Sequence, residues 1–309
     1  MCDDAIKYFK FYKSIKLKYE LYGLTMEVNM KKILVTGANG YLGQGIVKTL
    51  LDMGNIVIAS DIDVKYVDNR AIKKACNIFE LNDPYNYCEQ PDVLLHLAWR
   101  DGFVHYSDSH IIDLPKHYAF LKLMAKSNIE TISVMGSMHE IGFFEGSIDE
   151  NTPCRPESFY GIAKNALREI TRMYCKQFEK NFQWLRGYYI VGDSSVGSSI
   201  FSKICKSAED GKKTFPFTMG LNQFDFVDYD VFCNQVAVTI MQNEINGIIN
   251  ICSGRPEKLS DRVERFIKEH NFDIKLEYGK FPDRPYDSKA VWGNSTKIEK
   301  IMNNYHLNK

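Results

Sequence analysis

The sequence predicts an α/β fold, in which a doubly wound parallel sheet is accompanied by a smaller mixed C-terminal substrate lobe. Three observations indicate this class. Short continuous apolar runs alternate with segments of helical spacing over residues 32–190. A glycine-rich turn separates the first apolar run from the first helical segment. After Gly192 the alternation gives way to loop-like sequence, short helices and short strands that are interrupted by prolines.

The first expected strand and helix flank the glycine-rich turn. Residues 33–36 form a short apolar run, and residues 41–53 have helical spacing that ends at Gly54. Residues 55–60 are again apolar and β-branched. Continuous apolar runs suit strands that are covered on both faces, as in a parallel sheet.

Further apolar runs continue this pattern along the chain. We expect strands at residues 77–79, 93–97, 131–135 and 183–189, with helices near residues 110–126 and 160–180. Because strands that alternate with helices are joined by crossovers, the sheet is expected to be parallel. The predicted plan is a nucleotide-binding domain over residues 30–190 and mainly a substrate-binding lobe over residues 191–309.

Residues 1–29 differ from the rest and are treated as an N-terminal extension. They are rich in Lys and Tyr and have neither an unbroken apolar core nor a small-residue cleavage site, so they do not resemble a signal peptide. Two interpretations remain open. The extension is either a short amphipathic helix on the surface, or a dispensable segment before a true start at Met30.

Composition excludes several classes of function. Lys plus Arg number 39 and Asp plus Glu also number 39, so a broad basic face for nucleic acid or anionic lipid is not expected. No run of 18 apolar residues exists that could cross a membrane. The eight cysteines include no C-x-x-C pair, which favours reduced thiols in a cytoplasmic protein over disulfides or a metal site.

The glycine-rich turn has the spacing G-x-x-G-x-x-G. Glycines let backbone N–H groups approach a pyrophosphate, and the N-terminus of the following helix favours its negative charge. We therefore place Gly37, Gly40, Tyr41, Leu42 and Gly43 at a dinucleotide cofactor. A tight strand-to-helix turn without a ligand is the alternative.

Asp61 ends the second expected strand, 24 residues after Gly37. An acid at this point can accept hydrogen bonds from the adenosine ribose and would repel a 2′-phosphate. Asp61 therefore favours NAD over NADP, although NADP remains possible. Asp63 could share this role, and Asp61 could instead only cap the next segment.

Tyr160 and Lys164 are four residues apart, a spacing that places both on one face of a helix. A nearby ammonium stabilises a phenolate, so such a tyrosine can exchange a proton with a hydroxyl or carbonyl while a nicotinamide moves hydride. Ser137 follows the fifth expected strand, at the edge where open α/β sheets bind ligands. Its hydroxyl could orient a substrate oxygen, or it could simply form a turn.

Together these residues resemble the extended short-chain dehydrogenase/reductase family, in its NAD-dependent epimerase/dehydratase branch. The resemblance covers nearly all of residues 31–300 and rests on T-G-x-x-G-x-x-G at 36–43, Asp61, His-Leu-Ala at 96–98, Ser137 and Tyr160-x-x-x-Lys164. It implies a Rossmann fold with Ala98 beside the cofactor. It also implies that Tyr160 is the catalytic acid/base, that Lys164 lowers its pKa and binds the nicotinamide ribose, and that Ser137 holds the reacting oxygen.

The resemblance also indicates where a nucleotide sugar would bind. Arg284 resembles the arginine that contacts the sugar-nucleotide diphosphate, with a surface ion pair as the alternative. His139 would lie close to the sugar, either bonding a hydroxyl or packing behind the site. Tyr189 is also expected at the substrate. It lies in the segment where UDP-sugar epimerases carry an asparagine, which weakens the interpretation of this chain as a UDP-sugar 4-epimerase. His96 is expected to be a buried, hydrogen-bonded core residue.

Dehydratases of this branch carry Thr-Asp-Glu where this chain has Ser137, Met138 and His139, so a dehydratase is not expected. The leading hypothesis is an oxidoreductase that uses NAD(P)H to reduce the C4 ketone of a nucleoside-diphospho-4-keto-6-deoxyhexose, with a dTDP-linked sugar of a surface-polysaccharide pathway as substrate. A nucleotide-sugar 4-epimerase is the alternative, and a non-catalytic dinucleotide-binding module is a third hypothesis. Residues 105–126 and 160–180 could form a homodimer interface.

Overall fold

The computed structural model describes residues 30–195, 199–282 and 288–307. The N-terminal extension and Arg284 lie outside the described residues, so both interpretations of the extension remain predictions. Residues from Lys31 onward form one compact unit. Within the described residues, no helix is long and apolar enough to cross a membrane.

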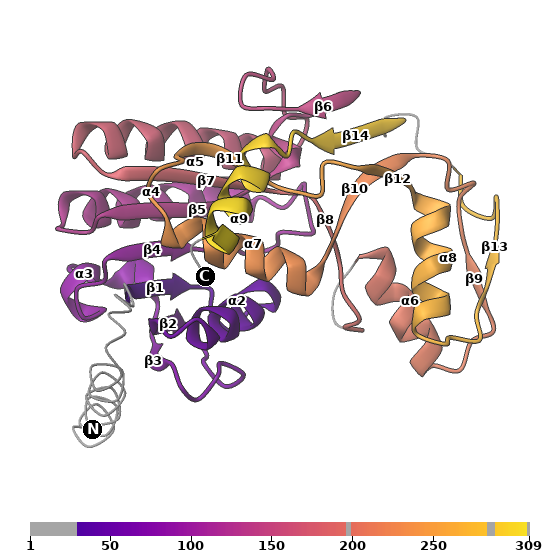
Figure 1. Ribbon diagram of the computed structural model, residues 1–309, viewed down its shortest axis with the longest axis horizontal. Coiled ribbons are helices and arrows are strands. Elements are labelled where there is room, and N and C mark those ends of the chain that lie inside the picture. The colour runs from indigo at the N-terminus through magenta and orange to yellow at the C-terminus, as the bar shows by residue number, and fades with distance from the viewer. Residues whose placement is uncertain (1–29, 196–198, 283–287, 308–309) are drawn as a thin grey trace. The chain divides into compact units, whose positions relative to one another are not determined.

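A seven-stranded parallel sheet forms the centre of this unit (Figure 1). Its order is β11-β7-β5-β4-β1-β2-β3, with every neighbouring pair parallel. The strands are β1 (Lys32–Thr36), β2 (Ile56–Asp61), β3 (Ile72–Ala75), β4 (Val93–His96), β5 (Thr131–Ser137), β7 (Asn181–Gly187) and β11 (Gly247–Ile251). The strand order reverses between β1 and β4, and in open α/β sheets ligands bind at the carboxyl ends beside such a reversal.

Helices cover both faces of the sheet, as the sequence predicts for a doubly wound fold. On one face, Ile33 and Val35 of β1 join a core that includes residues of α2 (Tyr41–Asp52), α7 (Tyr229–Met241) and α9 (Thr296–Leu307). On the other face, Leu34 packs in a core with α4 (Ser109–Lys126) and α5 (Phe159–Gln177). Both faces of β1 are therefore apolar and buried, which explains its unbroken apolar sequence.

The prediction of a strand at residues 77–79 is wrong. These residues belong to the 3₁₀ helix η1 (Ile78–Glu80), because the Asn77 side chain accepts a hydrogen bond from the Phe79 backbone N–H and caps it. A short helix α3 (Pro84–Tyr87) follows. The third strand is instead β3, an edge strand with no fully buried residue, so its sequence carries no apolar run.

The expected strand over residues 183–189 is two strands. β7 ends at Gly187, and the next strand, β8 (Tyr189–Val191), leaves the large sheet to pair with β10 (Gln223–Asp228). Strand β10 is also part of a smaller mixed sheet of order β12-β10-β14-β6. The other strands of that sheet are β6 (Gly146–Ile148), β12 (Pro256–Lys258) and β14 (Ala290–Gly293).

The smaller lobe also contains α6 (Ile200–Glu209), α8 (Leu259–Glu269) and a pair of short strands, β9 (Thr214–Pro216) and β13 (Lys275–Glu277). Figure 1 shows these four elements away from the large sheet. Strand β11 and helices α7 and α9 also follow residue 190 but pack with the large sheet. The assignment of substrate binding mainly to residues 191–309 stays a prediction.

Asp225 of β10 is a fully buried carboxylate that joins the segments of the smaller sheet. One oxygen accepts from the Ser253 backbone N–H and hydroxyl, at 2.7 and 2.6 Å, and the other from the N–H groups of Gly254 and Gly293, both at 3.0 Å. Asp225→Asn replaces one carboxylate oxygen with an NH₂ group, which then faces two hydrogen-bond donors. We therefore expect the free energy of unfolding to fall by about 3 kcal/mol. Urea unfolding measures this loss.

Asp273→Asn is the matched control, because this carboxylate is 88% exposed and pairs only with Lys213 in the described contacts. Its urea midpoint should stay at the wild-type value. Equal midpoints for the two variants would contradict a structural role for Asp225.

Candidate active site

Close backbone packing requires glycine at two positions of the turn between β1 and α2. Gly37 has a φ of +69°, and a Cβ there would lie 2.6 Å from the backbone nitrogen of Ala98. A Cβ on Gly43 would lie 2.3 Å from the Gly37 carbonyl oxygen. The first glycine therefore lets the turn meet the chain after β4, and the third lets α2 start directly against the turn.

The N-terminus of α2 remains open to an anion. Gly40 is its N-cap, and no side chain among the described residues caps the first turn. The backbone N–H groups of this turn, which includes Tyr41 and Leu42, are therefore free to bind a phosphate group. The Tyr41 ring packs against Tyr229 with centroids 4.6 Å apart, so its side chain serves to join α2 to α7.

Asp61 lies at the end of β2, directly beside the glycine-rich turn. Its two carboxylate oxygens accept hydrogen bonds from the backbone N–H groups of Asn39 (3.0 Å) and Ile62 (2.8 Å). Each oxygen keeps a lone pair for a ribose hydroxyl. Asp63 instead accepts from the Lys65 backbone N–H at 2.9 Å in an exposed turn, which favours Asp61 for the ribose role. The glycine-rich turn, the N-terminus of α2 and Asp61 together fit a dinucleotide that has no 2′-phosphate.

The structure brings Ser137 and Tyr160 together. Ser137 is the last residue of β5 and Tyr160 the second residue of α5, whose first turn is capped by the Ser158 hydroxyl. The Ser137 hydroxyl lies near the Tyr160 hydroxyl and acts to lower its pKa. Burial outweighs this effect and raises the pKa of Tyr160 to about 12, so the hydroxyl is protonated at neutral pH.

Lys164 lies one helical turn after Tyr160 and is buried. Its Nζ donates to the Met135 carbonyl oxygen at 2.8 Å and sits 3.8 Å from the centroid of the Trp99 indole ring. Burial lowers the pKa of Lys164 to about 7, and the negative charge of Glu140 opposes this shift. The ring of Trp99 favours the ammonium form, since cations are attracted to aromatic faces.

Two histidines beside Tyr160 come from different segments. The His105 ring stacks on the Tyr160 ring at 5.1 Å and 9°, and the His139 ring lies 4.3 Å from His105. Burial lowers the pKa of His139 to about 4 and also lowers the pKa of His105. Both imidazoles are therefore neutral near pH 7 and can exchange hydrogen bonds with a polar ligand. The sequence predicts His139 at this place, whereas it does not mark His105.

Trp99 and His110 complete the wall of aromatic rings around Tyr160. The His110 ring is 5.3 Å from Tyr160, and its Nδ1 accepts from the Trp99 indole N–H at 3.0 Å. Its Nε2 must then donate to the Val104 carbonyl oxygen, 3.0 Å away, which identifies the neutral tautomer with the proton on Nε2. This arrangement fixes the indole on which Lys164 rests.

The prediction for His96 is confirmed. The residue is buried and hydrogen-bonded on both ring nitrogens, to the Thr36 hydroxyl at 2.7 Å and to His117 at 2.8 Å. Ala98 lies against Gly37, and its place beside the cofactor stays a prediction. Tyr189 packs on Phe224 with centroids 4.5 Å apart, and its role in substrate binding stays a prediction.

A pocket lies in the smaller lobe, where α6 faces β9. Its volume is about 380 Å³. The lining includes Lys203, Lys206, Lys212, Phe215 and Phe281. The pocket therefore offers cationic side chains together with aromatic ones, a combination that suits an anionic ligand with a planar ring.

Comparison with known proteins identifies the family. Residues 33–252 match the model of the "NAD dependent epimerase/dehydratase family". The chain belongs to this family. It is therefore an NAD-dependent enzyme of the extended short-chain dehydrogenase/reductase type, and the Rossmann-like sheet predicted from the sequence is confirmed.

One curated relative, dTDP-6-deoxy-L-talose 4-dehydrogenase (NAD(+)) of Aggregatibacter actinomycetemcomitans, is 43% identical over 84% of this chain and 98% of its own length. Solved structures share the fold at lower identity. The UDP-N-acetylglucosamine 4-epimerase of Methanobrevibacter ruminantium has a TM-score of 0.75 at 18% identity, covering 88% of this chain and 92% of its own. The UDP-glucose 4-epimerase of Thermus thermophilus, in complex with NAD, has a TM-score of 0.74 at 17% identity, covering 87% and 92%.

Proposed function

We propose that this enzyme interconverts a C4 ketone and a C4 hydroxyl on a nucleoside-diphospho-6-deoxyhexose, with a dTDP-linked sugar as substrate. The observation that carries the proposal is the 43% identity to a dTDP-6-deoxy-L-talose 4-dehydrogenase over nearly the whole of that relative. The meeting of the Ser137 and Tyr160 hydroxyls at the carboxyl end of β5 supplies the chemistry for this reaction.

NAD, when bound at the glycine-rich turn, carries the hydride that C4 gains or loses. In the reductive direction Tyr160 is protonated at neutral pH and gives its proton to the sugar O4. The Ser137 hydroxyl holds the same oxygen by a hydrogen bond, and the Lys164 ammonium stabilises the phenolate that Tyr160 becomes. One hydride on carbon and one proton on oxygen convert the ketone to the alcohol, and the reverse transfers oxidise the alcohol.

The residues after Ser137 argue against elimination of water. Met138 and His139 provide no carboxylate, and burial keeps His139 neutral. A neutral imidazole can instead hold a hydroxyl of the sugar ring as donor or acceptor. We therefore propose that His139 binds and orients the sugar.

The basic pocket of the smaller lobe supports a nucleoside diphosphate as the other half of the substrate. The Lys203 ammonium suits a phosphate, and Phe215 and Phe281 suit the base, whereas Lys206 and Lys212 already pair with Asp210 at 3.0 and 3.9 Å. Arg284 is proposed to join this set. A homodimer through residues 105–126 and 160–180 stays a prediction, which the molar mass in solution tests.

The test is a nicotinamide absorbance assay in both directions. We expect a dTDP-4-keto-6-deoxyhexose to oxidise NADH in equimolar amount, with NADPH used at least roughly tenfold less efficiently because Asp61 repels a 2′-phosphate. We also expect dTDP-6-deoxy-L-talose to reduce NAD⁺. No change in either direction would contradict the proposal. Isomerisation of a UDP-sugar without added coenzyme would identify the 4-epimerase alternative instead.

A further inference from the structure

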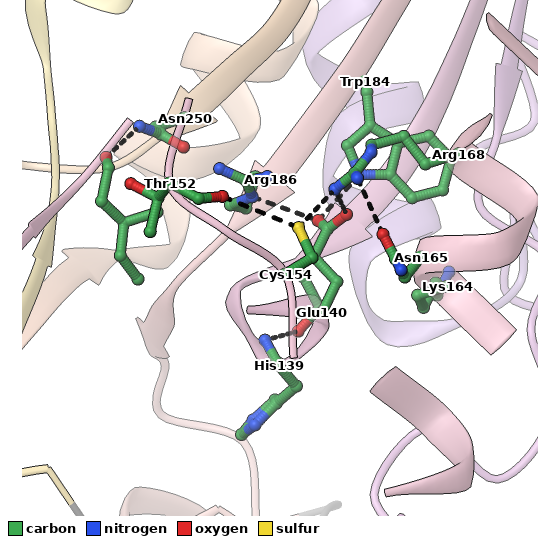
Figure 2. Close-up of polar contacts among 12 residues, drawn as sticks. His139, Glu140, Thr152, Cys154, Lys164, Asn165, Arg168, Trp184, Arg186 and Asn250 are labelled. Atoms are coloured by element: carbon green, nitrogen blue, oxygen red, sulfur yellow. Dashed lines mark hydrogen bonds and ion pairs between the residues drawn. The ribbon is translucent and has the colours of Figure 1, made fainter. Parts of the chain in front are cut away.

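A buried carboxylate, Glu140, lies between two arginines just behind the site (Figure 2). Its Oε2 is 2.6 Å from Nη1 of Arg168, and its Oε1 is 3.2 Å from Nε of Arg186. The Trp184 indole N–H donates to the same Oε1 at 2.8 Å. Side-chain exposure is 0% for Glu140 and Arg186 and 8% for Arg168, so these contacts are formed away from water.

These partners come from the elements that carry the catalytic residues. Glu140 ends the short helix η2 (Met138–Glu140), three residues after Ser137. Arg168 lies on α5 four residues after Lys164 and eight after Tyr160, which places all three on one face of that helix. The carboxylate therefore connects the end of β5 to the catalytic face of α5.

Two glycines allow the segments around Glu140 to pack closely. A Cβ on Gly161, the residue after Tyr160, would lie 2.4 Å from the His139 carbonyl oxygen, so α5 and η2 are in direct contact. A Cβ on Gly136 would lie 2.1 Å from the Trp184 indole nitrogen, so the indole crosses the end of β5 to reach Glu140. Any change in the Glu140 contacts is thus transmitted to both segments that hold the catalytic hydroxyls.

Glu140 balances the charge of two buried arginines. Nη1 of Arg186 donates to the Asp149 carbonyl oxygen at 2.9 Å, and Arg168 also pairs with Glu169, whose side chain is 47% exposed. Glu140 is the buried anion that both guanidiniums contact. Removing one partner of a buried ion pair leaves an uncompensated charge in a medium of low dielectric constant, which is strongly unfavourable.

The groups that face Lys164 come from four elements. They are Tyr160 on α5 itself, His96 from β4, His117 from α4 and Glu140 from η2, with the Trp99 ring beneath the ammonium. Burial holds the pKa of His117 near 3 and that of His96 well below its usual value, so both are neutral. Glu140 therefore supplies the negative charge that favours the Lys164 ammonium.

We propose that Glu140 is a positioning residue of this enzyme, whose carboxylate clamps α5 to the end of β5 through Arg168 and Arg186 and so holds Tyr160 and Lys164 against Ser137. Only the turnover part of its test rests on the proposed function, because cofactor binding is measured without a sugar.

Glu140→Gln tests the proposal, because glutamine keeps the size and the bond to Trp184 but removes the charge. We measure the Kd of NADH by fluorescence from pH 6 to 9, together with kcat and KM for the sugar. Wild-type binding should weaken as pH rises through about 7, where Lys164 loses its proton. In the variant this midpoint should fall by about one pH unit. The misplaced Tyr160 should lower kcat roughly tenfold or more, with little change in the sugar KM.

Three further variants keep the result interpretable. Glu140→Asp retains the charge and should restore the wild-type pH midpoint while kcat stays low. Glu140→Gln with Arg168→Gln removes both charges of one pair, so it should fold even if the single variant does not, and it should show the same lower midpoint. Arg262→Gln removes a buried arginine that contacts Asp228 at 2.6 Å in the smaller lobe, and it should lower Tm without moving the midpoint.

A Glu140→Gln variant with lower Tm but wild-type kcat and pH midpoint would overturn the proposal, because a purely structural ion pair behaves in that way. If the wild-type protein binds NADH but turns over no sugar, the proposed function fails, and the pH midpoint of NADH binding still decides the role of Glu140.

Discussion

Tyr160→Phe is expected to lower kcat for the sugar by roughly 10³-fold while NADH binds with wild-type affinity. The substitution removes only the hydroxyl that meets Ser137, and the ring remains stacked between His105 and the other aromatic side chains. Without a proton donor at O4, hydride transfer to C4 would leave an unprotonated alkoxide. Single-turnover absorbance at saturating NADH measures the loss at the chemical step.

The matched control is Tyr87→Phe, which removes a hydroxyl from a 44% exposed side chain on α3 and should leave kcat unchanged. The neutral imidazoles of His105 and His139 lie near enough to Tyr160 to be considered as other proton donors. Retention of more than roughly a tenth of wild-type kcat in Tyr160→Phe would assign the proton to one of them and contradict the role of Tyr160.

The sequence predicts those parts of the fold where one physical constraint dominates. Strands β1, β2, β4 and β5 are covered on both faces and appear as apolar runs. Strand β3 has the sequence Ile-Lys-Lys-Ala and a neighbour on one side only, so no such run marks it. The apolar residues that follow it pack as the turn of η1, where Asn77 caps the helix.

Some site residues can also be predicted from local sequence, and others cannot. Tyr160 and Lys164 are recognisable because helical spacing places them on one face, and Ser137 because it ends a strand. Trp99 and His105 belong to a loop whose return over α5 has no local signature. Glu140 meets Arg168 and Arg186 across 28 and 46 residues, and a single glutamate carries no sign of such distant partners. Contacts of this kind depend on tertiary structure alone.

Gly43→Ala is expected to have the largest effect on cofactor binding. The added methyl would lie 2.3 Å from the Gly37 carbonyl oxygen and 2.7 Å from two backbone atoms of Ala38. These are main-chain atoms of the turn, so no side chain can move aside, and α2 must shift away from β1. We expect the free energy of unfolding to fall by about 3 kcal/mol and the Kd of NADH to rise by roughly a hundredfold. Urea unfolding and NADH fluorescence measure the two effects.

Gly54→Ala separates steric clash from backbone strain. Gly54 follows the other end of the same helix with a φ of +84°, and a Cβ there would meet nothing within 4 Å. The free energy of unfolding of this variant should fall by only about 1 kcal/mol, because alanine is strained in the left-handed conformation. The variant should bind NADH normally. If Gly43→Ala proved as stable as Gly54→Ala and still bound NADH, close packing of α2 on the turn would not be what creates the phosphate site. If only Gly43→Ala loses NADH binding, the close contact between Gly43 and Gly37 is what the phosphate site requires.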